Sequence, residues 1–312
     1  MKNQRLSLNW CRAVRLGPLV AIALVLAIFT TGCGSMNKSA AKRIRAFSTA
    51  TELTAKNTVD AFDTVEKRHF DLTVARLAVG DEWKSFDPQA LAPFLPPEQL
   101  QVRKEVLAGL QGYAETLSAL MGNQQLDALD EATADLAESL KSANGEFVKA
   151  NFTAASDKEI EIGVTALNAL GRWLIDWKRH KAVASAAVEM HPHVTNIVRL
   201  LQSDFKVLRR NIGKEYDEEI QAKRRFIDAN EARLDPIAKR VEIRAIVETV
   251  LEMKQADTAL AAMQKSLTKL QEAHAELPNA FKSKGGIRLD ELIADSIEEG
   301  KRIKKFYDSL EN

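Results

Sequence analysis

The most constraining feature of this sequence is a long run without proline or glycine in which apolar residues return every three or four positions. The run lies between Pro236 and Leu277, and Asp257 and Gln264 interrupt it. Its apolar positions are Ile243, Ile246, Val250, Met253, Leu260, Leu267 and Leu270. This spacing places them along one face of an α-helix. Because such a helix would be about 60 Å long at 1.5 Å per residue, we expect an elongated molecule.

The same spacing predicts six or seven helices along the chain. Their expected ranges are 42–79, 97–122, 123–144, 156–189, 194–232, 236–277 and 289–310. Gly and Pro are scarce and clustered, and no stretch alternates apolar and polar residues as a strand does. Short turns make neighbouring helices antiparallel. We therefore expect an all-α fold, an elongated antiparallel helical bundle with coiled-coil character.

Three interruptions divide the predicted bundle. Segment 81–97 holds four prolines together with Trp83, Phe86 and Phe94, so it cannot be a continuous helix. A connection this long and apolar either packs over the bundle end or contacts a partner, and it is also a candidate hinge. Residues 190–193, Met-His-Pro-His, predict a turn, and residues 284–286 predict a flexible joint.

The N-terminus has a layout of its own. An unbroken apolar run, 19–29, is followed by Thr-Thr-Gly-Cys ending at Cys33. The first sixteen residues contain no acidic residue and four basic ones, Lys2, Arg5, Arg12 and Arg15. This segment resembles a bacterial lipoprotein signal peptide ending in a lipobox. The resemblance implies that residues 1–32 are removed and that the thiol of Cys33 is acylated. Residues 33–41 would be a polar tether and 42–312 the helical domain.

An uncleaved membrane anchor is the alternative, since the uncharged window 16–37 approaches the length of a membrane span. Both interpretations place the remaining chain outside the cytoplasm. The absence of Asp after Cys33 favours, by the same resemblance, the periplasmic face of an outer membrane. The other cysteine, Cys11, is removed with the signal peptide, so we expect no disulfide.

The charge balance limits the partners. Removing the signal peptide leaves 40 basic and 43 acidic residues, a net charge of −3. Such a mixture argues against nucleic acid and against docking on anionic lipid. Membrane attachment would come from the acyl chains instead. No cofactor is predicted, since neither a G-x-S-x-G elbow nor a Gly-rich phosphate loop occurs.

Histidines and tryptophans provide the candidate site residues. His191 and His193 could offer two imidazoles to a metal, with a third ligand from Glu189 or another helix, although a solvated turn is the simpler reading. Glu66 and His69 have the Glu-x-x-His spacing of di-iron bundles, but the motif occurs once. The tryptophans of one helical face either pack in the bundle or form a contact patch. The candidate interaction surface comprises Trp83, Phe86, Phe94, Trp173 and Trp177.

These patterns favour a non-enzymatic envelope lipoprotein that acts as a scaffold or protein-interaction module for another envelope protein. The alternative is a periplasmic bundle that binds a ligand or a metal, and an envelope enzyme is a third hypothesis. The seam in 236–277 also predicts a homodimer. The charged run 214–225 is expected to be a solvated face with ion pairs, or else a docking surface.

Overall fold

The computed structural model describes residues 33–79, 82–88, 91–121, 165–166, 168–174, 183–281 and 286–310. Within these ranges the regular structure is helical and no strand occurs, which confirms the all-α class. The predicted signal segment 1–32, the predicted helix 123–144 and Trp177 lie outside the described residues.

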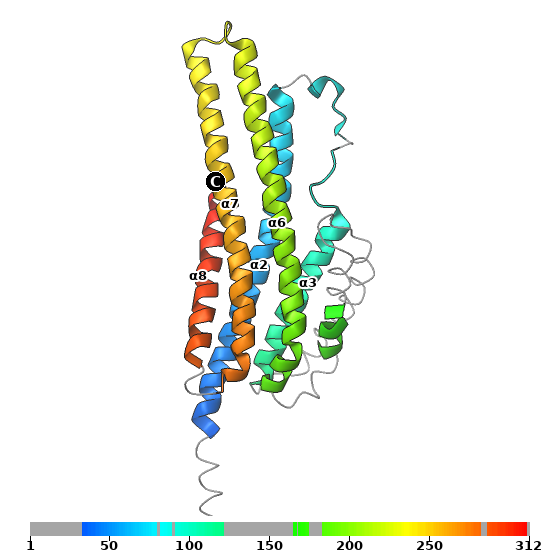
Figure 1. The fold of residues 1–312 in the computed structure, drawn as a ribbon, viewed down its shortest axis with the longest axis vertical. Helices are drawn as coiled ribbons and strands as arrows, with labels where there is room; N and C mark the ends of the chain where they lie inside the picture. Colours follow the sequence, from blue (N-terminus) through cyan, green and yellow to red (C-terminus); the bar gives the residue numbers. More distant parts are fainter. Residues whose placement is uncertain are drawn as a thin grey trace, which may run out of the picture.

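Long helices lie side by side in an elongated bundle (Figure 1). They are α2 (Cys33–Val79), α3 (Pro97–Leu120), α6 (Val183–Asn230), α7 (Pro236–Glu276) and α8 (Gly286–Leu310). Short 3-10 helices occupy Glu82–Ser85 and Leu277–Asn279, and residues 165–166 and 168–174 add helical turns beside α3. Helices α2, α6 and α8 run in one direction, and α3 and α7 run in the other. Since α6 has 48 residues, it is about 72 Å long.

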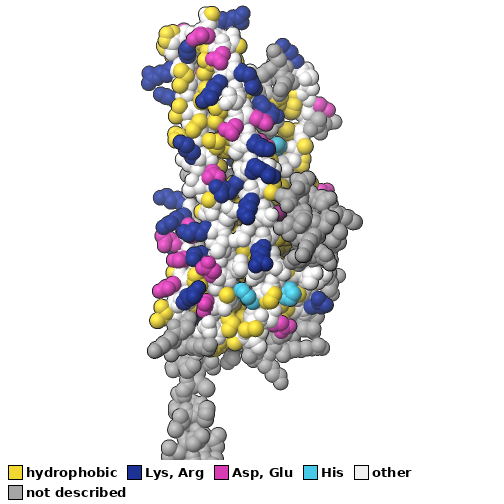
Figure 2. Space-filling model, viewed as in Figure 1, with side chains coloured by type: hydrophobic (Ala, Val, Ile, Leu, Met, Phe, Trp, Pro, Cys, Tyr) yellow, Lys and Arg dark blue, Asp and Glu magenta, His cyan; other side chains and the backbone are white. Residues whose placement is uncertain are grey.

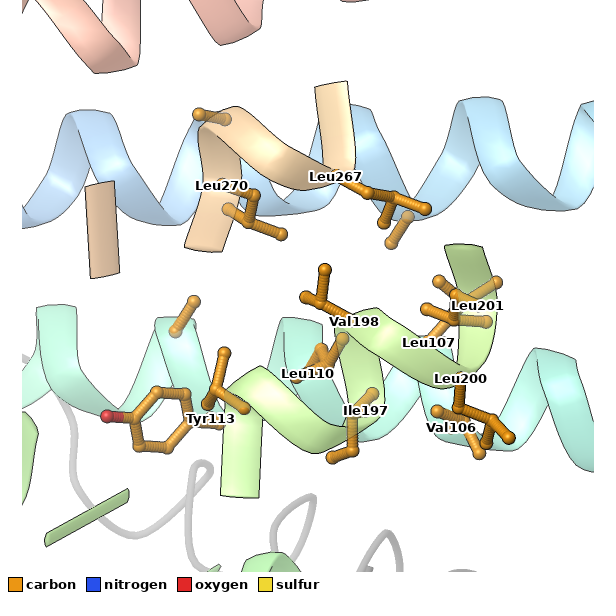
Figure 3. Close-up of a cluster of buried hydrophobic side chains, with 14 of the residues drawn as sticks. Val106, Leu107, Leu110, Tyr113, Ile197, Val198, Leu200, Leu201, Leu267 and Leu270 are labelled. Carbon is orange, nitrogen blue, oxygen red and sulfur yellow. The ribbon is translucent and has the colours of Figure 1, made fainter. Parts of the chain in front are cut away.

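One hydrophobic core joins these helices along their length. Figure 3 shows its centre, where side chains of α3, α6 and α7 point toward one another. The labelled residues are Val106, Leu107, Leu110 and Tyr113 of α3, Ile197, Val198, Leu200 and Leu201 of α6, and Leu267 and Leu270 of α7. Their spacing of three and four along each helix is the reason that they share a face. The apolar seam predicted for residues 236–277 thus packs largely in the chain's own core.

Most boundaries of the described helices lie close to the predicted ones, and the differences lie at the N-termini of α2, α6 and α8. Helix α3 begins at Pro97 and α7 at Pro236, as expected. Helix α2 begins at Cys33 rather than near residue 42, so the residues predicted as a tether are helical. Helix α8 begins at Gly286, which we had expected in a joint. A Cβ on Gly286 would lie 1.9 Å from the guanidinium carbon of Arg43, so any other residue there would displace the Arg43 side chain.

The turn predicted at residues 190–193 was wrong, because α6 continues through Pro192. A proline inside a helix loses one hydrogen bond and costs about 3 kcal/mol. The carbonyl that loses its donor belongs to Val188, which is exposed and open to water. On the opposite side, Met190 and Val194 are buried at helical spacing in the same core. Continuous burial of that face therefore outweighs the local cost of proline.

The start of α7 provides a first prediction. The Asp235 carboxylate accepts hydrogen bonds of 2.8 Å from the backbone N–H groups of Ile237 and Ala238, as its N-cap position predicts. Replacing Asp235 with Ala should lower the free energy of unfolding by about 1 kcal/mol. Urea unfolding measures this change, and Asp235→Asn, which keeps the acceptor, is the control. Equal losses for Ala and Asn would contradict the capping role.

Candidate interaction surface

Helix α8 ends beside the middle of α7. The two helices are antiparallel, and an ion pair between Lys265 and Glu299 sets their register. Leu310 ends α8 eleven residues after Glu299, so it falls beside Lys254, which lies eleven residues before Lys265. The part of α7 before Lys254 therefore extends past the end of α8 (Figure 1).

Beyond α8, α7 exposes a set of aliphatic side chains. They are Ile237, Val241, Ile243, Val247 and Leu251, with exposed fractions between 48% and 77%. Soluble proteins expose single apolar residues routinely, so five within one stretch of a helix make this stretch a candidate interaction site. We call this group, together with the exposed Arg240, Arg244, Glu248 and Lys254 between its members, the uncovered α7 face. Figure 2 shows hydrophobic, Lys and Arg side chains intermixed along the outer edge of the hairpin.

The charges of the uncovered α7 face have no ion-pair partner among the residues that the structure describes. None of its three basic residues, nor Glu248, forms an ion pair with any residue that the structure describes. Two half-exposed cations nearby are paired: Lys239 contacts Glu231 at 2.7 Å, and Arg209 contacts Asp257 at 2.7 Å. The face therefore combines apolar contact area with a net positive charge that is free to meet a partner.

A polar network on the opposite side of α7 holds this face in place. Arg68 of α2 forms an ion pair with Glu252 and donates a 3.0 Å hydrogen bond to the Tyr216 hydroxyl of α6. Lys223 contacts the buried Glu219 at 2.6 Å and donates to the Thr249 hydroxyl at 2.8 Å. Because these groups link three helices, the α6–α7 hairpin is braced rather than free at its base.

This network corrects the reading of the charged run 214–225. We had expected a solvated face, yet Tyr216 and Glu219 are buried and Glu215 is half-buried. Only part of the run is exposed, including Lys214 and Asp217, which line an open groove of about 680 Å³ between α6 and α7. Met253, Lys254, Asp257 and Thr258 form its α7 side, and through Lys254 the groove adjoins the uncovered α7 face.

The proline-rich connection 81–97 is exposed near its N-terminal end and packed at its C-terminal end. Phe86 is exposed, whereas Leu95 is buried and Phe94 packs against the core. The backbone N–H groups of Phe94 and Leu95 donate to the Glu66 carboxylate at 3.1 and 3.0 Å. The packing alternative thus holds for the end of this segment, which packs on α2, whereas residues 84–88 are exposed and their contact with a partner stays a prediction. Trp83 lies in the 3-10 turn that opens it.

His69, the partner of Glu66 in the Glu-x-x-His motif, also serves this packing. Its Nε2 donates to the Ala92 carbonyl at 3.1 Å, and its Nδ1 lies 2.7 Å from Glu215 Oε1. A carbonyl oxygen only accepts hydrogen bonds, so Nε2 of His69 carries a proton. A hydrogen bond between Nδ1 and Glu215 Oε1 requires a second proton on one of these two atoms. Burial raises the pKa of Glu215, against the opposing effect of His69. The motif is a structural link between α2, the loop and α6.

Trp173 belongs to the core and not to an exposed patch. It is 3% exposed and meets the Tyr113 ring edge-on, with ring centroids 4.8 Å apart. Of the two alternatives for Trp173, packing in the bundle and an exposed contact patch, the structure thus has the first.

His191 lies beside a buried histidine that had not been singled out. Its Nδ1 is 3.2 Å from Nδ1 of His274, and the two rings stack with centroids 5.4 Å apart. His274 Nε2 is 2.8 Å from the Tyr113 hydroxyl. Full burial and the neighbouring His191 lower the pKa of His274 to about 3, so it is neutral at physiological pH. A heptad position on α7 and the spacing to Leu267 and Leu270 could have placed His274 in the core.

His193 does not join this pair, and burial, followed by the charge of Arg172, lowers its pKa. Among the described residues no group of three or more His, Cys, Asp or Glu side chains is arranged to hold a metal ion. The weak metal candidates His191 and His193 thus remain a prediction without a described ligand set.

Two further findings bear on attachment and assembly. None of the described helices has an apolar stretch long enough to cross a membrane. The predicted homodimer seam is divided: Leu260, Leu267 and Leu270 are buried in the chain's own core, while Ile243 is exposed. Only the N-terminal part of α7 thus remains available to another molecule.

Sequence reasoning missed the uncovered α7 face. Its signal was present, since residues 237, 241, 244, 248 and 251 repeat at four- and three-residue steps. The sequence could not show that α8 stops before reaching them. We found no family model, no curated protein and no solved structure that matches this chain.

Proposed function

We propose that this protein is a non-enzymatic scaffold of the bacterial envelope. In this proposal lipid on Cys33 holds it to a membrane, and the uncovered α7 face binds another envelope protein. The outer membrane, facing the periplasm, is the location that the lipoprotein-like N-terminus favours. The single observation that carries the proposal is an exposed, apolar and positively charged helix face at the far end of an elongated bundle.

The distance between the two ends supports this role. Cys33 begins α2 at one end of the molecule, and the turn that joins α6 to α7 lies at the other end (Figure 1). Helix α2 alone has 47 residues and is about 70 Å long. A lipid anchor at Cys33 would therefore present the uncovered α7 face well away from the membrane surface.

Site-specific photo-crosslinking in intact cells tests the proposal. A photoreactive amino acid is placed at Val241, which is 60% exposed, and in a second strain at Val188 on α6, which is 61% exposed. We expect one discrete adduct with an identified envelope protein from position 241 and none from position 188. Both probes have the same access to solvent, so the difference reports specific contact.

Cys33→Ser in the same cells tests the anchor. Intact-mass analysis should find acyl mass on the wild-type chain and none on the variant, and the adduct at position 241 should disappear with the lipid. Wild-type chain without acyl mass would overturn the anchor. Equal labelling from positions 188 and 241 would overturn the interaction surface.

A further inference from the structure

We propose that the uncovered α7 face binds an acidic amphipathic helix of the partner, which continues the line of α8 along α7. This inference rests on the proposed function and adds the chemistry of the partner.

The helical shape follows from what α8 already does. In the part of α7 that packs against α8, the small residues Ala259 and Ser266 are buried and Ala262 is half-buried. Stepping by three or four residues from these positions toward the start of α7 leads onto Leu251, Val247 and Val241. The uncovered α7 face is therefore the same helix face without its covering helix. An amphipathic helix can bury such a face with side chains at matching spacing.

The size of the face suits one short helix. It runs from Ile237 to Lys254, eighteen residues and about 27 Å of helix. A fully exposed aliphatic side chain presents on the order of 100 Å², so five that are about half exposed offer roughly 300 Å². This area lies well below the roughly 800 Å² per partner of a standard protein interface. A single docked helix matches it, whereas a broad globular interface does not.

The positive charge of the uncovered α7 face favours a partner helix with negative charge. Arg240, Arg244 and Lys254 face solvent with one acidic residue, Glu248, among them. Two copies of this face carry like charge and repel each other, so a second copy pairing face to face is disfavoured. Acidic side chains flanking the apolar seam of a partner helix would meet the two arginines, whose planar guanidinium groups suit carboxylates.

Two synthetic peptides of eighteen residues serve as probes. They share one leucine seam at helical spacing and carry either glutamate or lysine at the flanking positions. The full chain is reconstituted in nanodiscs of phosphatidylcholine, a neutral lipid, and binding is followed by fluorescence anisotropy. We expect the glutamate peptide to bind at least about tenfold more tightly than the lysine peptide, since like charges at a contact oppose binding.

Charge reversal gives the decisive arm. Arg240→Glu together with Arg244→Glu should invert the preference, so that the lysine peptide binds more tightly. Val241→Glu should weaken the glutamate peptide by at least about tenfold, because it places a charge in the apolar contact. Arg199→Glu with Lys206→Glu is the matched control, since both residues are exposed and neither forms an ion pair in the described part of the chain. It should leave the preference unchanged.

Three results would overturn the inference. They are equal affinity for both peptides, no binding of either, and a dimer of the protein alone in sedimentation that Val241→Glu dissociates. The last would assign the face to a second copy. If the peptides fail while the adduct at position 241 persists in cells, the proposed function stands and only the chemistry assigned to its partner is wrong.

Discussion

Replacing Arg103 with Met is expected to lower the free energy of unfolding by about 3–5 kcal/mol. Arg103 of α3 and Asp204 of α6 are 3% and 2% exposed and pair through two hydrogen bonds, Nε to Oδ2 at 3.1 Å and Nη2 to Oδ1 at 3.3 Å. Burial raises the pKa of Asp204, and Arg103 opposes that rise. Without the guanidinium, the carboxylate is left charged, buried and unpaired at neutral pH.

Denaturant unfolding at pH 7 measures this loss of stability, and two further variants serve as comparisons. Arg209→Met removes the same geometry from an exposed pair, since Arg209 binds Asp257 through 2.8 and 2.9 Å hydrogen bonds. Exposed pairs contribute about 0–1 kcal/mol. Arg103→Met combined with Asp204→Leu should recover most of the stability, because no charge is then buried.

The loss in Arg103→Met also has a defined pH dependence. In this variant Asp204 has a pKa in the folded state above its unfolded value, so protonation favours the folded state. The loss of stability therefore shrinks as the pH falls. A loss no larger than that of Arg209→Met, at any pH, would show that the buried pair does not hold α3 to α6.

His274 should make the protein sensitive to acid. Its pKa is lowered to about 3 in the folded state, against 6.5 for the free side chain. Below pH 6.5 His274 binds a proton in the unfolded chain but stays neutral in the folded chain. The free energy of unfolding therefore falls as the pH drops toward 3. The full contribution of this residue is roughly 4–5 kcal/mol, at 1.36 kcal/mol per pH unit.

His274→Phe isolates that contribution. At pH 7 the variant should be less stable by about 1–3 kcal/mol, because Tyr113 and His191 lose a hydrogen-bond partner in a buried site. The difference should shrink below pH 6.5 and reverse by about pH 4–5, since phenylalanine does not titrate. Urea unfolding of both proteins between pH 4 and 7.5 measures it. A difference that stays constant over this range would contradict burial of a neutral imidazole.

The elements that local chemistry controls were predictable. Proline at the first turn marked the starts of α3 and α7, and the side chain of Asp235 marked the cap of α7. Periodic apolar residues indicated the core faces, including Leu267 and Leu270. These signals act over one to four residues, so they need no knowledge of the remaining chain.

Other features depended on contacts between distant residues. Pro192 predicted a turn, but burial on both sides of it keeps α6 continuous. Glu66 and His69 resembled a metal motif, but they bind a loop and Glu215. Trp173 had two readings, and Tyr113 of another helix decided between them.

The sequence by itself determined the all-α class and most boundaries of the described helices, because each depends on neighbouring residues, and its N-terminus resembles a lipoprotein signal peptide on the same local basis. The tertiary structure alone decided which apolar face of α7 is covered. Residues 237–251 and 259–273 have similar spacing, yet α8 reaches only the second group. Exposure is a property of what lies next to a helix, and for this reason the uncovered α7 face emerged only when the helices were assembled.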